Sequence, residues 1–152
     1  MHKAITTAVI ILAVSSLVAC GNPASDENMI MEGRSIARRQ LYNPPSAKFG
    51  PAFVARKDDG RDFAVCGYIN GRNSLRAYTG LRRFVVTGKF IDSKPHFIAA
   101  HLDDGNMRVT KNNPQDPENA LRRATHFEWK IWNPNCESPS HPAAYNGQQP
   151  HD

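Results

Sequence analysis

Residues 61–70 read RDFAVCGYIN, and the fold of the chain depends on how this stretch is covered. Successive side chains of a strand point to opposite faces. Apolar side chains occur on both faces here, with Phe63, Val65 and Ile69 on one and Ala64, Cys66 and Tyr68 on the other. A strand with two apolar faces is covered on both sides, so we expect it in the interior of a sheet.

Further stretches of the chain have strand character, and turn signals separate them. The expected strands are residues 51–57, 61–70, 82–90, 97–102 and 107–110. The turn signals are the DDG of 58–60, the DSKP of 92–95 and the DDGN of 103–106. Short turns join antiparallel neighbours, so the sequence predicts an antiparallel sheet of about five strands.

A first helix is expected to begin after Ser25, whose hydroxyl can accept from a free amide of the first turn. Asp26 and Glu27 suit the positive end of the helix dipole. Gly33 interrupts the apolar face, and it indicates either close packing against a neighbour or a weak helix. The Asn-Pro-Pro of residues 43–45 ends the helix, because proline cannot donate the helical hydrogen bond.

A second helix is expected from Asp116, with Pro117 in its first position, and Asn133-Pro134 ends it. Its apolar face would be formed by Ala120, Leu121, Ala124, Phe127 and Ile131. The polar, proline-rich residues 137–152 are expected to be a disordered tail. Residues 26–136 should then form a single globular α+β domain, in which an N-terminal and a C-terminal helix flank the antiparallel sheet.

Residues 1–20 have the features of an export signal: a short positive start, uncharged residues 4–19, and a final cysteine. The ending Leu17-Val18-Ala19-Cys20 resembles the lipobox of bacterial lipoproteins, in which the cysteine is acylated and the peptide is cut before it. The resemblance implies a signal peptide over 1–19 and a lipidated Cys20 that begins a tether over 20–25. An ordinary signal peptide and an uncleaved anchor are the alternatives. By the same resemblance, Gly21 implies an outer-membrane protein that faces the periplasm.

The chain has three cysteines. With Cys20 lipidated, Cys66 and Cys136 remain as a pair in an oxidising compartment, and we expect a disulfide between them. A free buried thiol, or a catalytic or metal-binding cysteine, is the alternative. No histidine lies near Cys66 in the sequence, and the histidines show no metal-ligand spacing. We expect no cofactor and no metal.

Residues 43–49, 65–86 and 127–136 carry the motifs NPPSAKF, VCGYINGRNSLRAYTGLRRFVV and FEWKIWNPNC. Together they resemble a family of small exported proteins and lipoproteins of proteobacteria. The matching positions are Pro44, Ser46, Ala47, Lys48, Phe49, Cys66, Gly67, Asn70, Asn73, Tyr78, Gly80, Phe84, Trp132 and Cys136. The chain departs at Asn43, where aspartate is common, and at Leu75-Arg76, where an aromatic residue and a glycine are common. The resemblance supports the fold and the export, and it implies no activity.

The polar connection after the 61–70 strand is the candidate binding loop, because loops placed by a rigid sheet often bind ligands. Its candidate residues are Asn70, Arg72, Asn73, Arg76, Tyr78, Arg82 and Arg83. The alternative is structural: the asparagines make Asx-turns, and the arginine pair is solvated.

The net charge of +5 favours anionic partners, and export makes nucleic acid an unsuitable one. A solvated basic surface is the alternative. We expect a non-catalytic, membrane-anchored envelope lipoprotein that binds a protein or an anionic envelope component, with an inhibitor or immunity role included. A structural accessory subunit of an envelope assembly is the alternative function. A small hydrolase fits least, because the paired aspartates lie in DDG turns and His96 and His101 should face opposite sides of a strand.

Overall fold

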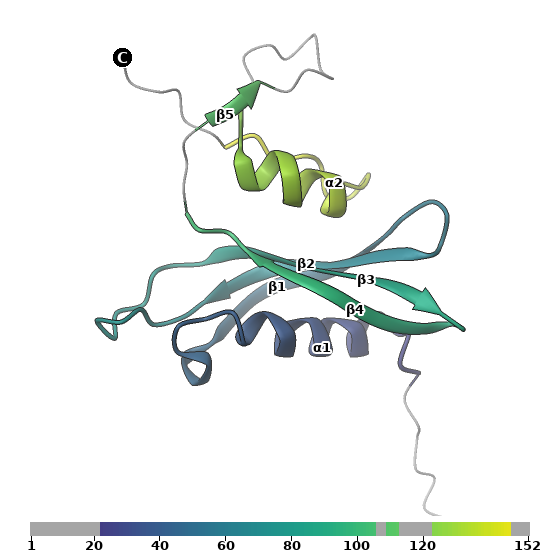
Figure 1. The fold of residues 1–152 in the computed structure, drawn as a ribbon, viewed down its shortest axis with the longest axis horizontal. Coiled ribbons are helices and arrows are strands. Elements are labelled where there is room, and N and C mark those ends of the chain that lie inside the picture. Colours follow the sequence, from purple (N-terminus) through teal and green to yellow (C-terminus); the bar gives the residue numbers. More distant parts are fainter. Residues whose placement is uncertain (1–21, 106–108, 113–122, 147–152) are drawn as a thin grey trace, which may run out of the picture.

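The computed structural model describes residues 22–105, 109–112 and 123–146. Four strands form an antiparallel sheet in the order β1-β2-β3-β4. Their bounds are Lys48–Arg56, Asp62–Asn70, Arg82–Ile91 and Lys94–Leu102. Figure 1 shows α1 (Asp26–Arg38) against one face of this sheet and the C-terminal helix against the other. Cys20, the signal segment and their lipidation lie outside the described residues.

The predicted first helix is confirmed in its start and corrected in its end. Ser25 caps it, since its Oγ accepts from the backbone N–H of Asn28 at 3.4 Å. The helix ends at Arg38, and the prolines belong to a separate 3-10 turn, η1 (Pro44–Ser46). A Cβ built on Gly33 would lie 2.7 Å from Cγ1 of Val65. Gly33 therefore marks close packing of α1 against β2.

The interior position predicted for residues 61–70 is confirmed, because β2 pairs with β1 on one side and with β3 on the other. Each face of β2 contributes to a separate core. The face towards α1 packs Phe63, Val65 and Ile69 with Met29, Phe84 and Val86. The other face packs Ala64 and Cys66 with Val85, Phe127, Trp132 and Cys136. The alternating pattern of this one strand thus accounts for the three-layer arrangement.

Two of the three predicted hairpin turns are confirmed. Gly60 closes the turn between β1 and β2 with a φ of 66°. Asp92 and Ser93 form the two-residue turn between β3 and β4, with φ values of 49° and 61°. Positive φ at both central residues matches the twist of the flanking strands.

The predicted hairpin around 103–106 is wrong. The fifth strand, β5 (Val109–Asn112), pairs with β6 (Arg123–Thr125), so the main sheet has four strands. The chain leaves the sheet at Asp103, whose backbone N–H donates to the carbonyl oxygen of Arg83 at 2.9 Å. The Oδ2 atom of Asp103 binds the buried Arg83 guanidinium, while its Oδ1 atom accepts from the N–H of Gly105 at 3.1 Å.

The second helix was predicted to begin at Asp116, but residues 123–125 of the predicted helix form a strand. Residues 113–122 lie outside the described residues, and Ala124 belongs to β6. The helical run begins after Thr125 and passes through η3 (Glu128–Trp132) into α2 (Asn133–Cys136). Thr125 and Glu128 form a reciprocal capping box, with N···O distances of 2.8 and 3.1 Å. Threonine followed three residues later by glutamate was the sequence signal for this start.

The expected tail is packed over residues 137–146. The His141 ring stacks on Phe53 with 3.5 Å between centroids. Asn133 Oδ1 accepts from the backbone N–H of Ala144 at 2.8 Å, and the N–H of Asn146 donates to Glu128 at 3.0 Å. The composition predicted disorder because it contains few apolar residues, but one ring and a few hydrogen bonds attach this segment. Residues 147–152 lie outside the description.

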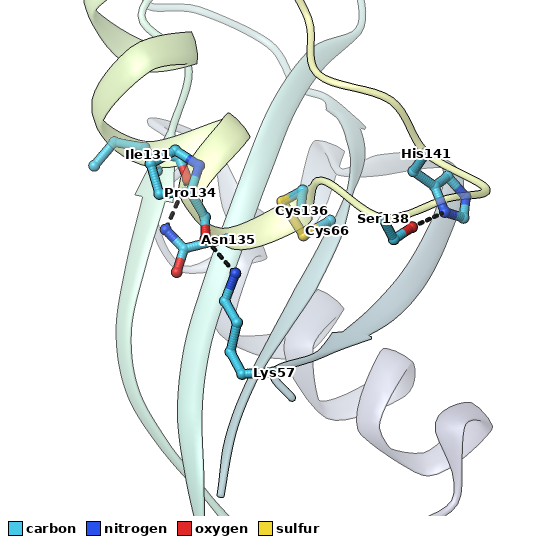
Figure 2. Close-up of a disulfide and its surroundings, with 8 residues drawn as sticks. All are labelled: Lys57, Cys66, Ile131, Pro134, Asn135, Cys136, Ser138 and His141. Carbon is cyan, nitrogen blue, oxygen red and sulfur yellow. Dashed lines mark hydrogen bonds between the residues drawn. A yellow bond between two sulfur atoms is a disulfide. The ribbon is translucent and has the colours of Figure 1, made fainter. Parts of the chain in front are cut away.

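The disulfide between Cys66 and Cys136 is confirmed, and it joins β2 to α2. Both cysteines are fully buried. Figure 2 shows that Lys57, just after β1, points to the helix that carries Cys136, where its Nζ donates to the carbonyl oxygen of Pro134. The C-terminal helix is therefore attached to the sheet by a covalent bond and by a hydrogen bond from the end of β1.

Candidate binding surface

The candidate loop, residues 71–81, connects β2 to β3 at one end of the sheet (Figure 1). Ser46 Oγ accepts from the backbone N–H of Arg72 at 2.8 Å, which attaches the loop to η1. Asn73 Oδ1 accepts from the N–H groups of Leu75 and Ala77 at 3.0 and 3.1 Å. Asn73 therefore shapes the loop from within, as the structural alternative expected, while the cationic side chains stay on its surface.

The tip of the loop presents an apolar side chain and a strained cation. Leu75 is 83% exposed. Arg76 has a φ of 62°, in the left-handed region that costs a residue with a Cβ on the order of 1 kcal/mol. Strain of this kind often occurs where a side chain serves a function.

Arg82 and Arg83 do not act as a pair, because they lie on opposite faces of β3. Arg83 is 8% exposed and donates to Asp103 Oδ2 at 2.9 and 3.0 Å and to Glu128 Oε1 at 3.0 Å. The Arg83 guanidinium also lies 5.5 Å from the ring centres of Phe127 and Trp132. Arg83 thus joins β3 to the C-terminal helix, and its charge is already neutralised.

Four cations from three segments gather at the start of β1. Lys48 Nζ lies 4.4 Å from the ring centre of Tyr78, and Arg72 Cζ lies 5.1 Å from it. Arg34 and Arg38 of α1 lie 5.4 and 5.6 Å from the ring centre of Phe49. We call Arg34, Arg38, Lys48 and Arg72 the four-cation surface.

Only Arg72 of the four-cation surface was a predicted site residue. Arg34 and Arg38 fall on the first helix, and Lys48 falls in the NPPSAKF motif, so they are distant from the loop in sequence. The i, i+4 spacing of Arg34 and Arg38 indicates a shared helix face. It does not indicate that this face meets β1 and the loop.

The charges of the domain are separated along the strands. Arg34, Arg38, Arg39, Lys48, Arg72, Arg76 and Arg82 form what we call the cationic end. Across the described residues, none of them is ion-paired with a carboxylate. At the other end, cations and carboxylates pair as Arg56–Asp26, Arg61–Asp59 and Lys89–Asp62. There the backbone N–H of Arg61 also lowers the pKa of Asp59 by hydrogen bonding to its carboxylate.

The N-terminal attachment lies at the end with the paired charges. The carbonyl oxygen of Asn22 accepts from the N–H of Ser25 at 3.0 Å and from Asn28 Nδ2 at 2.7 Å. Arg56 Nη2 donates to the carbonyl oxygen of Ala24 at 3.3 Å. The described part of the expected tether, from Asn22, is therefore held against the domain, and Figure 1 shows the start of α1 far from the 71–81 loop.

A cavity of about 420 Å³ opens beside β4, and His101 and His126 line it. The expectation that His96 and His101 face opposite sides is wrong. A β-bulge between Phe97 and Ala99 adds one residue to the strand, so both histidine side chains lie on the same face. Across the described ranges, no group of three or more His, Cys, Asp or Glu could hold a metal ion.

The chain matches no protein-family model, no curated protein and no solved structure. Within the described ranges, no helix is long and apolar enough to cross a membrane.

Proposed function

We propose that the protein is a lipoprotein of the bacterial cell envelope, anchored through lipid on Cys20, and that its domain is a non-catalytic binding module. The observation that carries this proposal is the cationic end, which lies opposite the N-terminal attachment and whose seven cations form no ion pair with a carboxylate among the described residues. Like charges held together repel one another and oppose folding. An anionic partner would relieve this repulsion, so the cationic end is well suited to bind one.

The place of the attachment supports the presentation of the cationic end away from the membrane. Cys20 lies two residues before Asn22, where the hydrogen-bonded part of the chain begins. β2 has nine residues, which span about 30 Å at about 3.3 Å per residue. This distance exceeds the Debye length of about 8 Å, so headgroup charges at the anchor would not occupy the cationic end of an upright domain. A partner would approach from the periplasm, if Gly21 directs the protein to the outer membrane.

Three carboxylates have structural partners, and this supports a role in binding. Asp103 and Glu128 are committed to Arg83, and Asp59 accepts hydrogen bonds within its own turn. A general acid or base needs a carboxylate that is free to reach a substrate. The partner is an envelope protein or another anionic envelope component, and inhibition of a toxic enzyme is one form of such binding.

The anchoring is tested by labelling cells with a radioactive fatty acid. The wild-type chain should carry the label, and the Cys20→Ser variant should not. Label that persists in Cys20→Ser would contradict the anchor.

The binding role is tested by chemical cross-linking of the full chain in cells, followed by identification of the captured components. The Arg72→Gln/Arg76→Gln variant should lose the capture. The Lys94→Gln variant, which removes a positive charge from β4 at the other end of the domain, should retain it. Capture that both variants retain would contradict a role of the cationic end and favour a structural accessory subunit.

A further inference from the structure

We propose that the four-cation surface binds a ligand that carries several phosphate groups. This inference rests on the proposed binding function and names the chemical class of the ligand. Arg34, Arg38, Lys48 and Arg72 form the surface, and Phe49 and Tyr78 are the two rings on which these cations lie.

Each ring holds two like charges close together. The Lys48 and Arg72 charges lie 4.4 and 5.1 Å from the centre of the Tyr78 ring, so the two charges are separated by no more than the sum of these distances. Such a separation is about one Debye length, at which repulsion is only partly screened. The attraction between a cation and a ring face offsets part of this repulsion. The rings thus hold the cations in position before a ligand arrives.

One donor of the surface lacks an acceptor. Arg34 Nη2 donates to the carbonyl oxygen of Gly50 at 2.8 Å. The Arg34 Nε atom is buried and has no hydrogen-bond partner among the described residues. Buried donors in proteins are usually paired, so Arg34 keeps a hydrogen-bonding capacity that the described residues do not use.

A single ligand that contacts all four cations needs more than one anionic group. Lys48 and Phe49 are consecutive in β1, so their side chains point to opposite sides of the strand. The Tyr78 pair and the Phe49 pair therefore lie on either side of the start of β1, and one small anion cannot contact both. Exposed ion pairs are individually weak, so useful affinity needs several contacts at once.

Phosphate suits these donors better than carboxylate. The donors come from α1, β1 and the 71–81 loop, and so from several directions rather than from one plane. The lone pairs of a carboxylate lie in its plane, whereas phosphate oxygens accept from all sides of a tetrahedron. Arginine forms paired hydrogen bonds with phosphate, and Lys48 adds a point charge. A chain of phosphates and the headgroups of phospholipids both present this chemistry.

The probe for the test is sodium tripolyphosphate, titrated calorimetrically into the full mature chain in non-ionic detergent. The dissociation constant should rise at least about tenfold for Lys48→Gln/Arg72→Gln, which removes two phosphate contacts. It should change less than about twofold for the matched control Arg61→Gln/Lys94→Gln, which removes the same charges at the other end. Affinity should also fall as salt is raised from about 50 to about 300 mM.

Two further measurements secure the assignment. Chemical-shift mapping on the unaltered chain should place the largest changes at residues 34, 38, 48 and 72, whatever the stability of the variants. Reconstitution in phosphatidylcholine vesicles with and without phosphatidylglycerol identifies the source. Competition by phosphatidylglycerol would assign the phosphates to lipid headgroups and would show that the domain does not stand upright on its anchor. Its absence would assign them to a soluble or polymer-borne ligand.

Three outcomes would overturn the inference: no binding of tripolyphosphate, equal binding of hexaglutamate, or equal losses in the control variant. These outcomes are distinct from failure of the proposed function. If the chain binds tripolyphosphate but is not labelled by the fatty acid, the proposed lipid anchor is wrong and the phosphate site stands. A labelled chain that captures a partner but not tripolyphosphate would remain a binding module for a different ligand class.

Discussion

Replacement of Glu128 by glutamine should lower the free energy of unfolding by about 3 kcal/mol. The side chain is fully buried. Its oxygens accept from Arg83 Nη1 at 3.0 Å, from the N–H of Thr125 at 2.8 Å and from the N–H of Asn146 at 3.0 Å. Glutamine offers one accepting oxygen, so at least one of these donors would face an NH2 group.

The magnitude follows from the loss of one partner of a buried ion pair, which costs about 3–5 kcal/mol. The lower value applies because Asp103 still neutralises Arg83 through two hydrogen bonds. For a domain of this size, a loss of about 3 kcal/mol corresponds to a fall in Tm of about 12 °C.

The assay is urea unfolding and thermal melting of the chain from Gly21, with the disulfide intact, followed by circular dichroism. Glu32→Gln is the matched control, because Glu32 is exposed on α1, and it should change stability by less than about 0.5 kcal/mol. The losses of Glu128→Gln and Arg83→Met should also not add, because the two residues share one interaction. A loss for Glu128→Gln no larger than that of the control would refute the buried network.

Four further outcomes are expected. Cys66→Ala and Cys136→Ala should each cost about 2–5 kcal/mol without adding, and non-reducing mass spectrometry should find the two peptides linked; two free thiols would contradict this. Gly33→Ala should cost about 1–3 kcal/mol in urea unfolding, because overpacking against β2 outweighs the gain of about 1 kcal/mol in helix propensity; a stabilised variant would show that α1 packs less closely. Deletion of residues 138–152 should lower the Tm by several degrees, since it removes a ring stack and backbone hydrogen bonds worth about 1–2 kcal/mol; an unchanged melt would restore the expectation of a disordered tail. Arg76→Gly should raise stability by about 1 kcal/mol while weakening capture of the partner in cells, and a variant that gains stability without losing capture would separate the strained cation from function.

Several features of the protein are encoded locally, and the sequence alone predicts them. The Ser25 cap, the turn at Gly60 and the Asp92-Ser93 turn each depend on residues within one or two turns of the chain. The two apolar faces of β2 predict an interior strand, and the cysteine count predicts the Cys66–Cys136 bond. Short-range sterics and hydrogen bonds determine the cap and the two turns. The interior strand and the disulfide are long-range features, and the sequence predicts them because an apolar pattern needs cover on both faces and because two cysteines remain once Cys20 is assigned to lipid.

The start of the C-terminal helix lies between these cases. The Thr125 and Glu128 side chains are a local signal, but a longer apolar helical pattern from Asp116 competes with it in the sequence. Strand pairing of residues 123–125 with β5, together with the buried contact of Glu128 with Arg83, favours the later start. The sequence alone does not decide between the two helix starts, because the contacts that favour the later one come from β3 and from β5.

The candidate site is the part that only the tertiary structure decided. The sequence identified Arg72 and the 71–81 loop, and it grouped Arg83 with them although β3 directs that side chain to the opposite face, against Glu128. Arg34 and Lys48 join the site because α1 packs across the sheet and ends beside the start of β1. Contacts between segments tens of residues apart depend on how whole elements compete to bury apolar surface, and local propensity carries no information on that competition.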